Sequence, residues 1–214
     1  MKWINFFTDY NIPYCIYKLN KEDNIVINNS TNNNDKSIVI IYGSIYIIKI
    51  FTEKTITPLV ILNHNSIFNL KKISTKTKFY YKLIALEQTY IISFKLSNLN
   101  NTKKINKHII LSIIDSYQKT LNRYEIINEI INQKYIKNKL IQLILFLCLD
   151  IGIIEKNKVY IPFRISQKHL AIIIGAKKTN INKMIQDLCK QKFIHYSNKK
   201  KISLSNVFNN YFEI

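Results

Sequence analysis

Glycine and proline are scarce in this sequence, with three of each among 214 residues. Because the only glycines are Gly43, Gly152 and Gly175, the sequence contains neither a P-loop motif nor a glycine-rich dinucleotide-binding motif. A catalytic group assembled from distant residues is the one enzyme interpretation left open. We therefore expect a protein that is not an enzyme.

Cysteine gives no sign of a disulfide framework or a metal site. Cys15, Cys148 and Cys189 are odd in number and far apart, without a C-x-x-C pair. Buried, reduced thiols in a reducing compartment are the expected state. We predict no metal ligands, because no cysteine or carboxylate stands at ligand spacing from any of the histidines, which are His64, His108, His169 and His195.

Long apolar runs are also missing. The N-terminal segment is interrupted by Asp9 and Pro13, unlike a signal peptide. The densest apolar run, Leu140 to Leu149, contains Gln142 and has about half the length that a membrane-spanning helix needs. We therefore expect no association with a membrane.

Positive charge is in excess, with 32 Lys and Arg against 13 Asp and Glu and a formal net charge of +19. A polyanion, and first of all nucleic acid, is the partner that such a charge favours. A codon bias toward A+T, which enriches Ile, Asn, Lys and Tyr, is the alternative source of the charge. Since 47% of the residues are hydrophobic and 12% aromatic, the chain is expected to fold, as one large domain or two small ones.

Residues 14 to 97 are predicted to form strands. Short runs rich in Ile, Tyr, Val and Thr are separated by Asn, Gly, Pro and charged residues, and residues 28–34 form a low-complexity loop. This spacing predicts a small antiparallel barrel or roll. The predicted strands are Ile25 to Ile27, Ser37 to Tyr42, Ser44 to Phe51, Thr57 to Leu62, Lys82 to Leu86 and Thr89 to Phe94.

From about Lys103 the apolar period becomes that of a helix. Apolar residues then recur at alternating spacings of four and three, which is typical of a seam between a long helix and a partner helix and predicts a homodimer. A single helix lying on its own domain is the alternative. The seam comprises Ile110, Ile114, Tyr117, Leu121, Tyr124, Asn128 and Ile131, in which Asn128 resembles a register-fixing polar residue.

Three short elements follow the seam helix. Lys139 to Asp150 is apolar on nearly every side, which predicts a buried helix ended by Gly152 as a C-cap glycine. Alternating apolar residues from Val159 to Ile165 predict a short strand. Ser166 is a good N-cap residue, so a new helix is expected to begin there.

The segment Gln167 to Gln186 has the spacing of a helix-turn-helix. Ala171, Gly175 and Ile181 occupy the positions where a close helix crossing needs a small residue, a sharp turn needs positive φ, and the second helix needs a branched anchor. This spacing alone is short enough to arise by chance. The helix that follows supports it.

The second helix of this segment has two distinct faces. Ile181, Met184, Ile185 and Leu188 form one apolar stripe. The opposite face carries only hydrogen-bonding side chains, without a carboxylate, and these can contact base edges or phosphates. A merely solvated face is the alternative, which the turn signature makes the weaker one. The polar face consists of Thr179, Asn182, Lys183, Gln186 and Lys190.

Phe193 to Leu204 follows as two short segments around a Ser197-Asn198 turn and three lysines, Lys199 to Lys201. A lysine-bearing hairpin beside a recognition helix is a wing, whose expected role is contact with phosphates.

These features predict an α+β fold with an N-terminal antiparallel β-roll at 1–102, a dimerisation helix at 103–133 and a C-terminal winged helix-turn-helix at 134–214. The predicted function is that of a sequence-specific regulator of transcription that binds double-stranded DNA. The alternative is a basic RNA-binding or ribosome-associated protein without base-specific readout. The predicted DNA contacts are Ser166, Gln167, Lys168, Lys177, Lys178, Thr179, Asn180, Asn182, Lys183, Gln186, Lys199 and Lys200.

The sequence resembles the Crp/Fnr family over nearly its whole length, and within that family its nitrogen-regulator branch, as found in cyanobacteria and red-algal plastid genomes. The most specific matches are KLIQLILFLCLDIG (139–152), RISQKHLAIIIGAKKTNINKMIQDL (164–188) and FIHYSNKKKISL (193–204). GSIYIIKIF (43–51) and NSIFNL (65–70) match more weakly.

The resemblance implies a cyclic-nucleotide-binding-like roll and a homodimer on a palindromic operator, with half-sites about one helical turn apart. It places Lys178, Thr179 and Lys183 at recognition positions. The family usually has Arg where Lys178 and Lys183 stand, and Lys lacks the planar fork of Arg. The resemblance further implies that RNA polymerase is a partner and that the protein activates nitrogen-related genes. The implied location is the plastid stroma, or the cytoplasm if the chain comes from a bacterium with an A+T-rich genome.

The resemblance also implies an effector site in the roll. Family members bind 2-oxoglutarate or cyclic AMP through a glycine-containing turn after a Phe, whereas here Phe68 is followed by Asn69, Leu70 and Lys71. Glu125 matches a helix position near the effector, and Arg123 or Lys78 is a candidate replacement for a lost cation. A dicarboxylate such as 2-oxoglutarate suits this surround better than a cyclic nucleotide, and no other cofactor is expected.

Overall fold

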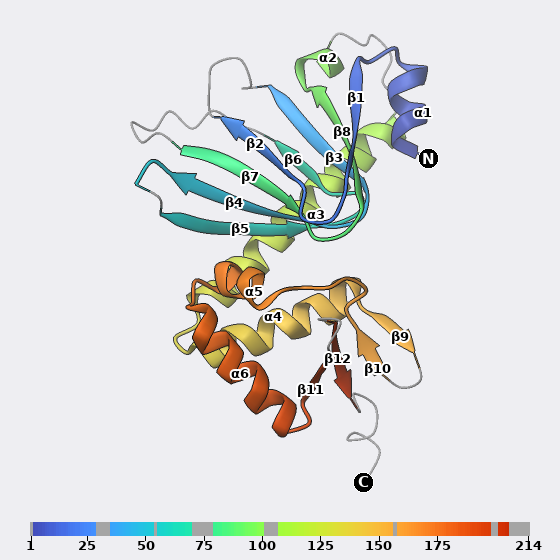
Figure 1. The fold of residues 1–214 in the computed structure, drawn as a ribbon. Coiled ribbons are helices and arrows are strands. Elements are labelled where there is room, and N and C mark those ends of the chain that lie inside the picture. The colour runs from blue at the N-terminus through green and yellow to red at the C-terminus, as the bar shows by residue number, and fades with distance from the viewer. Residues whose placement is uncertain are drawn as a thin grey trace. The chain divides into compact units, whose positions relative to one another are not determined.

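The computed structural model describes residues 2–28, 35–53, 55–69, 79–100, 107–155, 158–197 and 201–205. It comprises two compact units, Met1–Ile126 and Ile127–Ile214, each of which is described by itself (Figure 1). The predicted loop after Asn28, together with Leu70, Lys71, Lys78, Lys199 and Lys200, lies outside the described residues. The domain limits expected at 102 and 133 stay predictions.

The first unit contains two four-stranded antiparallel sheets, ordered β1-β8-β3-β6 and β2-β7-β4-β5, which form a roll. Its helices are α1 (Lys2–Asp9), α2 (Ser97–Asn100) and most of α3 (Lys107–Asn132). Its strands are β1 (Tyr14–Leu19), β2 (Asn24–Asn28), β3 (Lys36–Tyr42), β4 (Ile45–Phe51), β5 (Ile56–Leu62), β6 (Ile67–Asn69), β7 (Phe79–Ala85) and β8 (Thr89–Lys95).

Side chains fill the interior of the roll. Because successive residues of a strand point to opposite faces, Ile45 and Ile47 of β4 enter the same core. Phe68, Phe79 and Tyr81 pack edge to face there, with ring centroids 5.4 Å apart in each pair that shares Tyr81. The predicted antiparallel roll is confirmed, and its strands extend one to three residues beyond several of the predicted limits.

The helix α3 lies along the roll by one face and leaves another face exposed. Ile110, Ile114 and Leu121 of the predicted seam are 45%, 44% and 64% exposed. Tyr117 and Tyr124, by contrast, pack against the two cores of the roll. The exposed stripe is therefore narrower than the predicted seam, because these two tyrosines pack against the roll of their own chain.

Buried polar groups also attach α3 to the roll. Thr120 Oγ1 accepts a hydrogen bond from the Ile67 N–H at 3.1 Å and shares its own hydrogen between the carbonyls of Ile67 at 2.9 Å and Ser116 at 3.0 Å. Nη1 of Arg123 donates to Ser66 Oγ at 2.6 Å. Since β6 is the last strand of its sheet, Thr120 satisfies backbone groups that no other described strand pairs.

Thr120→Val is expected to lower the free energy of unfolding by about 2 kcal/mol, because it leaves the buried Ile67 N–H without an acceptor. Thermal unfolding of the full chain measures the change. The control is Thr57→Val on β5, an exposed position where the same substitution should have little effect. Equal changes at the two positions would contradict the assigned role of Thr120.

The second unit contains a four-stranded sheet, ordered β11-β12-β10-β9, and three helices, α4, α5 and α6. The helices are α4 (Ile136–Ile151), α5 (Gln167–Ile174) and α6 (Lys178–Lys190). The strands are β9 (Ile153–Glu155), β10 (Lys158–Tyr160), β11 (Ile194–Tyr196) and β12 (Ile202–Ser205).

The helix α4 is buried on one face only, contrary to the prediction. Its buried residues are Leu140, Leu143, Ile144, Leu147 and Cys148, whereas Leu149 is 87% exposed. Apolar residues all around a helix therefore do not mean burial all around it here.

The strand predicted from Val159 to Ile165 is also shorter than expected, because β10 ends at Tyr160. The alternation still decides burial, since Ile161, Phe163 and Ile165 are all buried in irregular backbone. The Ile161 N–H donates to the Ile202 carbonyl at 2.9 Å and continues the contact with β12 for one residue.

Gly152 ends α4, but not as a left-handed C-cap. Its φ of −66° and ψ of 146° are extended backbone that any residue adopts. Glycine is required at position 152 because there is no room for a side chain. An added Cβ would overlap the Cys148 carbonyl oxygen and would lie 2.7 Å from Val159 Cγ1.

Candidate nucleic-acid interface

The first helix of the predicted motif begins where expected. Ser166 is the N-cap of α5, and its Oγ accepts a hydrogen bond from the His169 N–H at 3.1 Å. Ala171 is 4% exposed, which agrees with a small residue at a helix crossing. Gln167 and Lys168 are the first two residues of α5, at the end of the helix away from the turn that follows Ile174.

The turn between α5 and α6 depends on Gly175. This residue has the left-handed values φ 66° and ψ 40°, and no atom lies within 4 Å of the position that its Cβ would take. The backbone conformation, and not the available space, therefore favours glycine here.

The two glycines are expected to respond differently to alanine. Gly175→Ala should cost about 1 kcal/mol of stability, which is the strain of a left-handed alanine. Gly152→Ala should cost about 3 kcal/mol, because a methyl group would overlap backbone that cannot turn away. Denaturant unfolding of the two variants compares these costs. A larger loss at Gly175 would contradict the structure of both turns.

The helix α6 has the two faces that the sequence predicts. On the buried face, Ile181, Ile185 and Leu188 are at most 2% exposed. The opposite, exposed face is called the reading face below, and it consists of Thr179, Asn182, Lys183, Gln186 and Lys190. The predicted contacts Lys177, Lys178 and Asn180 are exposed at the N-terminal end of α6.

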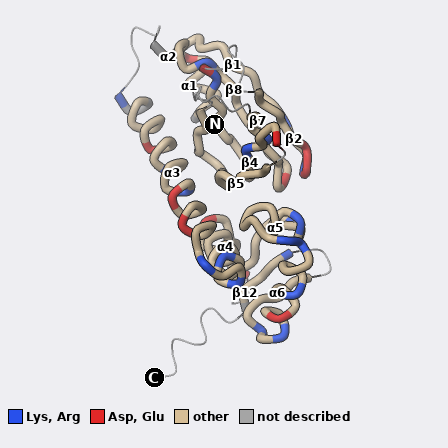
Figure 2. Tube along the Cα trace, turned by 90° about the vertical axis from the view of Figure 1, so that its left-hand side faces the viewer, with Lys and Arg blue, Asp and Glu red and all other residues tan. Residues whose placement is uncertain are grey.

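Charge follows the two helices of the motif. The basic residues are Lys168 on α5 and Lys178, Lys183 and Lys190 on α6, and Figure 2 shows blue at both helices. The acid on α6 is Asp187, which helical spacing places outside the reading face. A helix surface with lysines and neutral amides can approach phosphates without repulsion.

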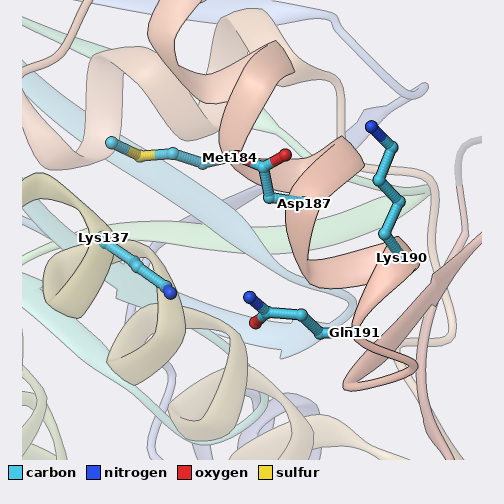
Figure 3. A pocket seen from close by; sticks show the side chains of 5 residues that line it. All are labelled: Lys137, Met184, Asp187, Lys190 and Gln191. Atoms are coloured by element: carbon cyan, nitrogen blue, oxygen red, sulfur yellow. The ribbon is translucent and has the colours of Figure 1, made fainter.

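A pocket of about 200 Å³ lies between α4 and α6 (Figure 3). Lys137 of α4 and Gln191 after α6 point toward each other across it. Lys190, a residue of the reading face, also lines the pocket. Sequence reasoning missed Lys137 because it stands 53 positions before Lys190 and no local pattern links the two. Asp187 also lines the pocket, which keeps it from being purely cationic.

The predicted wing is a hairpin of β11 and β12, paired with Ile194 opposite Leu204. Ser197 and Lys201 close its described part, since the Ser197 N–H donates to the Lys201 carbonyl at 3.0 Å and the Lys201 N–H to Ser197 Oγ at 3.1 Å. Lys199 and Lys200 are in the connection, outside the described residues.

The structure describes four of the predicted effector residues, Phe68, Asn69, Arg123 and Glu125, and they lie in different surroundings. Phe68 belongs to the core of the roll, where Tyr81 covers it, and Asn69 is half-buried at the end of β6. Glu125 is exposed on α3, whereas Arg123, two residues before it, is buried against Ser66. The helix repeat explains the difference, because residues two positions apart on a helix point in directions about 200° apart, to nearly opposite sides.

A cation in the roll was missed by sequence reasoning. Nζ of Lys49 on β4 lies 3.8 Å from the ring centroid of Phe79 and 4.7 Å from that of Phe51. The signal for it is the strand alternation, because Lys49 shares the parity of the inward-facing Ile45 and Ile47.

No described helix is long and apolar enough to cross a membrane. Within the described ranges, no three His, Cys, Asp or Glu side chains are grouped to hold a metal ion.

No family model matches this sequence. It is 28% identical over 200 residues, 94% of this chain and 82% of the other, to the Porphyra purpurea protein ycf28, whose name describes it as an HTH-type transcriptional regulator. It is 20% identical over 164 residues, 76% of this chain and 73% of the other, to the global nitrogen regulator of Nostoc sp.. A transcriptional regulator of the CRP/FNR family from Thermus thermophilus matches the fold with a TM-score of 0.65, at 15% identity over 89% of this chain and 93% of that one.

Proposed function

We propose that this chain, which is similar in sequence to global nitrogen regulators and has the fold of a CRP/FNR-family regulator, is a sequence-specific, DNA-binding regulator of transcription. The observation that carries the proposal is α6, where a continuous row of hydrogen-bonding side chains faces outward while Ile181 and Leu188 fix the helix from behind.

In this function α6 enters the major groove. Lys183 donates to acceptors on guanine, and the amides of Asn182 and Gln186 can donate or accept on base edges. The lysines of the wing contact phosphates, which adds affinity and salt dependence without sequence information. The DNA contacts proposed for Ser166 and Lys168 rest on their place at the start of α5, and those at the start of α6 rest on their place just after the Gly175 turn.

The protein acts as a homodimer in this proposal. The exposed apolar side chains of Ile110, Ile114 and Leu121 recur at spacings of four and seven on α3, which gives a second copy an apolar strip to cover. Two recognition helices related by a twofold axis would read a palindromic operator.

The finer role proposed is activation of nitrogen-related genes, with RNA polymerase as the partner at the promoter. The name of the Nostoc relative supports a role in nitrogen regulation, and the Porphyra relative together with the A+T-biased composition supports a plastid location.

For the roll we propose a dicarboxylate, with 2-oxoglutarate as the ligand to test, in preference to a cyclic nucleotide. Lys49 and Arg123 bring positive charge to the roll and to its contact with α3, and guanidinium and ammonium groups pair well with carboxylates.

The alternative, a ribosome-associated RNA-binding protein, is separated by two measurements. The native protein should sediment as a free dimer, and not as a monomer that travels with ribosomes. Duplex DNA should bind at least tenfold more tightly than duplex RNA of the same sequence, because the major groove of A-form RNA does not admit a helix. Equal or tighter binding to RNA would overturn the proposal.

A further inference from the structure

Two predicted DNA contacts touch each other across the helix-turn-helix. Nε2 of Gln167, the first residue of α5, donates to Oδ1 of Asn182 on α6 at 3.1 Å. Asn182 belongs to the reading face and is exposed, whereas Gln167 is half-buried. The contact therefore joins the start of the first helix to the middle of the base-reading row.

The surrounding structure holds both partners in place. The Ser166 side chain caps the end of α5 that carries Gln167, and the left-handed Gly175 sets the angle at which α6 follows. Ile181, next to Asn182, is fully buried, so the backbone of Asn182 cannot rotate about the helix axis. With both backbones fixed, the remaining freedom of Gln167 and Asn182 is the rotation of their side-chain amides.

That orientation decides what Asn182 offers to DNA. A free asparagine amide pairs bidentately with adenine, with Oδ1 accepting from N6 and Nδ2 donating to N7. When Gln167 occupies Oδ1, the part of the amide left for DNA is the Nδ2 donor. A donor pairs with guanine, which presents O6 and N7, two acceptors, in the major groove.

We propose that Gln167 is a positioning residue that turns Asn182 into a donor and thereby makes it prefer guanine over adenine at one base pair of the half-site. This inference rests on the proposed function and specifies its sequence preference. In water a hydrogen bond between two exposed amides is weak. When α6 lies in the major groove, the DNA excludes water from this pair, which strengthens the hydrogen bond in the complex where the bases are read.

The test begins with locating the base pair. Sequences bound by the wild-type protein and by Asn182→Ala are selected from random DNA, and the position where the variant loses its preference is the one that Asn182 contacts. Guanine is expected there in the wild type, at about tenfold over adenine. If Asn182→Ala changed no position, the inference would be overturned.

Gln167→Glu then reverses the hydrogen bond without changing the shape of the side chain. A carboxylate only accepts, so the Nδ2 group of Asn182 must turn toward it and Oδ1 toward the DNA. The ratio of guanine to adenine at that position is expected to fall by about tenfold or more. Gln167→Ala removes the constraint and should give an intermediate ratio.

Gln191→Glu is the matched control, because it adds the same charge after the end of α6, outside the reading face. It should weaken binding to all DNA while leaving the ratio of bases unchanged. A wild-type ratio in Gln167→Glu would overturn the role of Gln167 even if the protein still selected a palindrome. A wild-type protein without any base preference would overturn the proposed function as well.

Discussion

Replacing Ile181 with alanine is expected to lower the free energy of unfolding of the second unit by about 4 kcal/mol. The Ile181 side chain is fully buried, and its loss leaves a cavity between α5 and α6 that the well-packed neighbours Ile185 and Leu188 cannot fill. Because this cavity adjoins the turn, operator binding should be lost together with stability. Denaturant unfolding and DNA binding of the same preparation measure both effects.

Ile153→Ala is the control for Ile181→Ala. Ile153 belongs to the same unit but is 44% exposed, so the same truncation should cost less than about 1 kcal/mol and leave DNA binding intact. Similar losses at both positions would show that Ile181 is not the anchor of the second helix.

Replacing Lys183 with alanine is expected to reduce affinity for the operator by about 10- to 100-fold, the range for loss of a good base contact. Affinity for random DNA should fall by only a few fold, because one cation is lost from a large positive surface. Discrimination between the two DNAs therefore collapses. Equilibrium binding to the two duplexes at one salt concentration gives the ratio.

Two further substitutions separate the contact of Lys183 from its charge. Lys183→Arg should keep or raise discrimination, because the guanidinium fork donates two hydrogen bonds to guanine. Lys18→Ala, which removes the same charge from β1 of the roll, should leave discrimination unchanged. Equal effects of Lys18→Ala and Lys183→Ala would contradict the role of α6.

The helix-turn-helix could be predicted closely because local sequence determines it. A capping serine, a glycine at positive φ and an apolar stripe each act over a few residues, and all three are in place at Ser166, Gly175 and α6. The order of the strands could not be predicted, because the pairs β1 with β8 and β2 with β7 join residues far apart in the sequence.

Some elements of the roll left no local signal. In β1, Cys15, Ile16 and Tyr17 are exposed at the sheet edge, so the strand lacks the alternation that would mark it. The helix α1 is stabilised by packing, with Phe7 4.8 Å from Phe94 between ring centroids, which a pattern search does not see.

The contacts within the candidate site were predictable only in part. The residue types on the reading face follow from helical spacing, but the hydrogen bond from Gln167 to Asn182 depends on the angle between two helices. Likewise, the close approach of Cys148 and Val159 to Gly152 depends on how α4 meets β10. Geometry between elements decides both.

Selection of bound sequences from random duplex DNA by the wild-type protein is the direct test of base reading by α6. A palindrome whose half-sites are centred about one helical turn apart should be enriched, and this enrichment should be lost in Lys183→Ala. Recovery of sequences without a shared motif, at an affinity that depends only on salt, would contradict it.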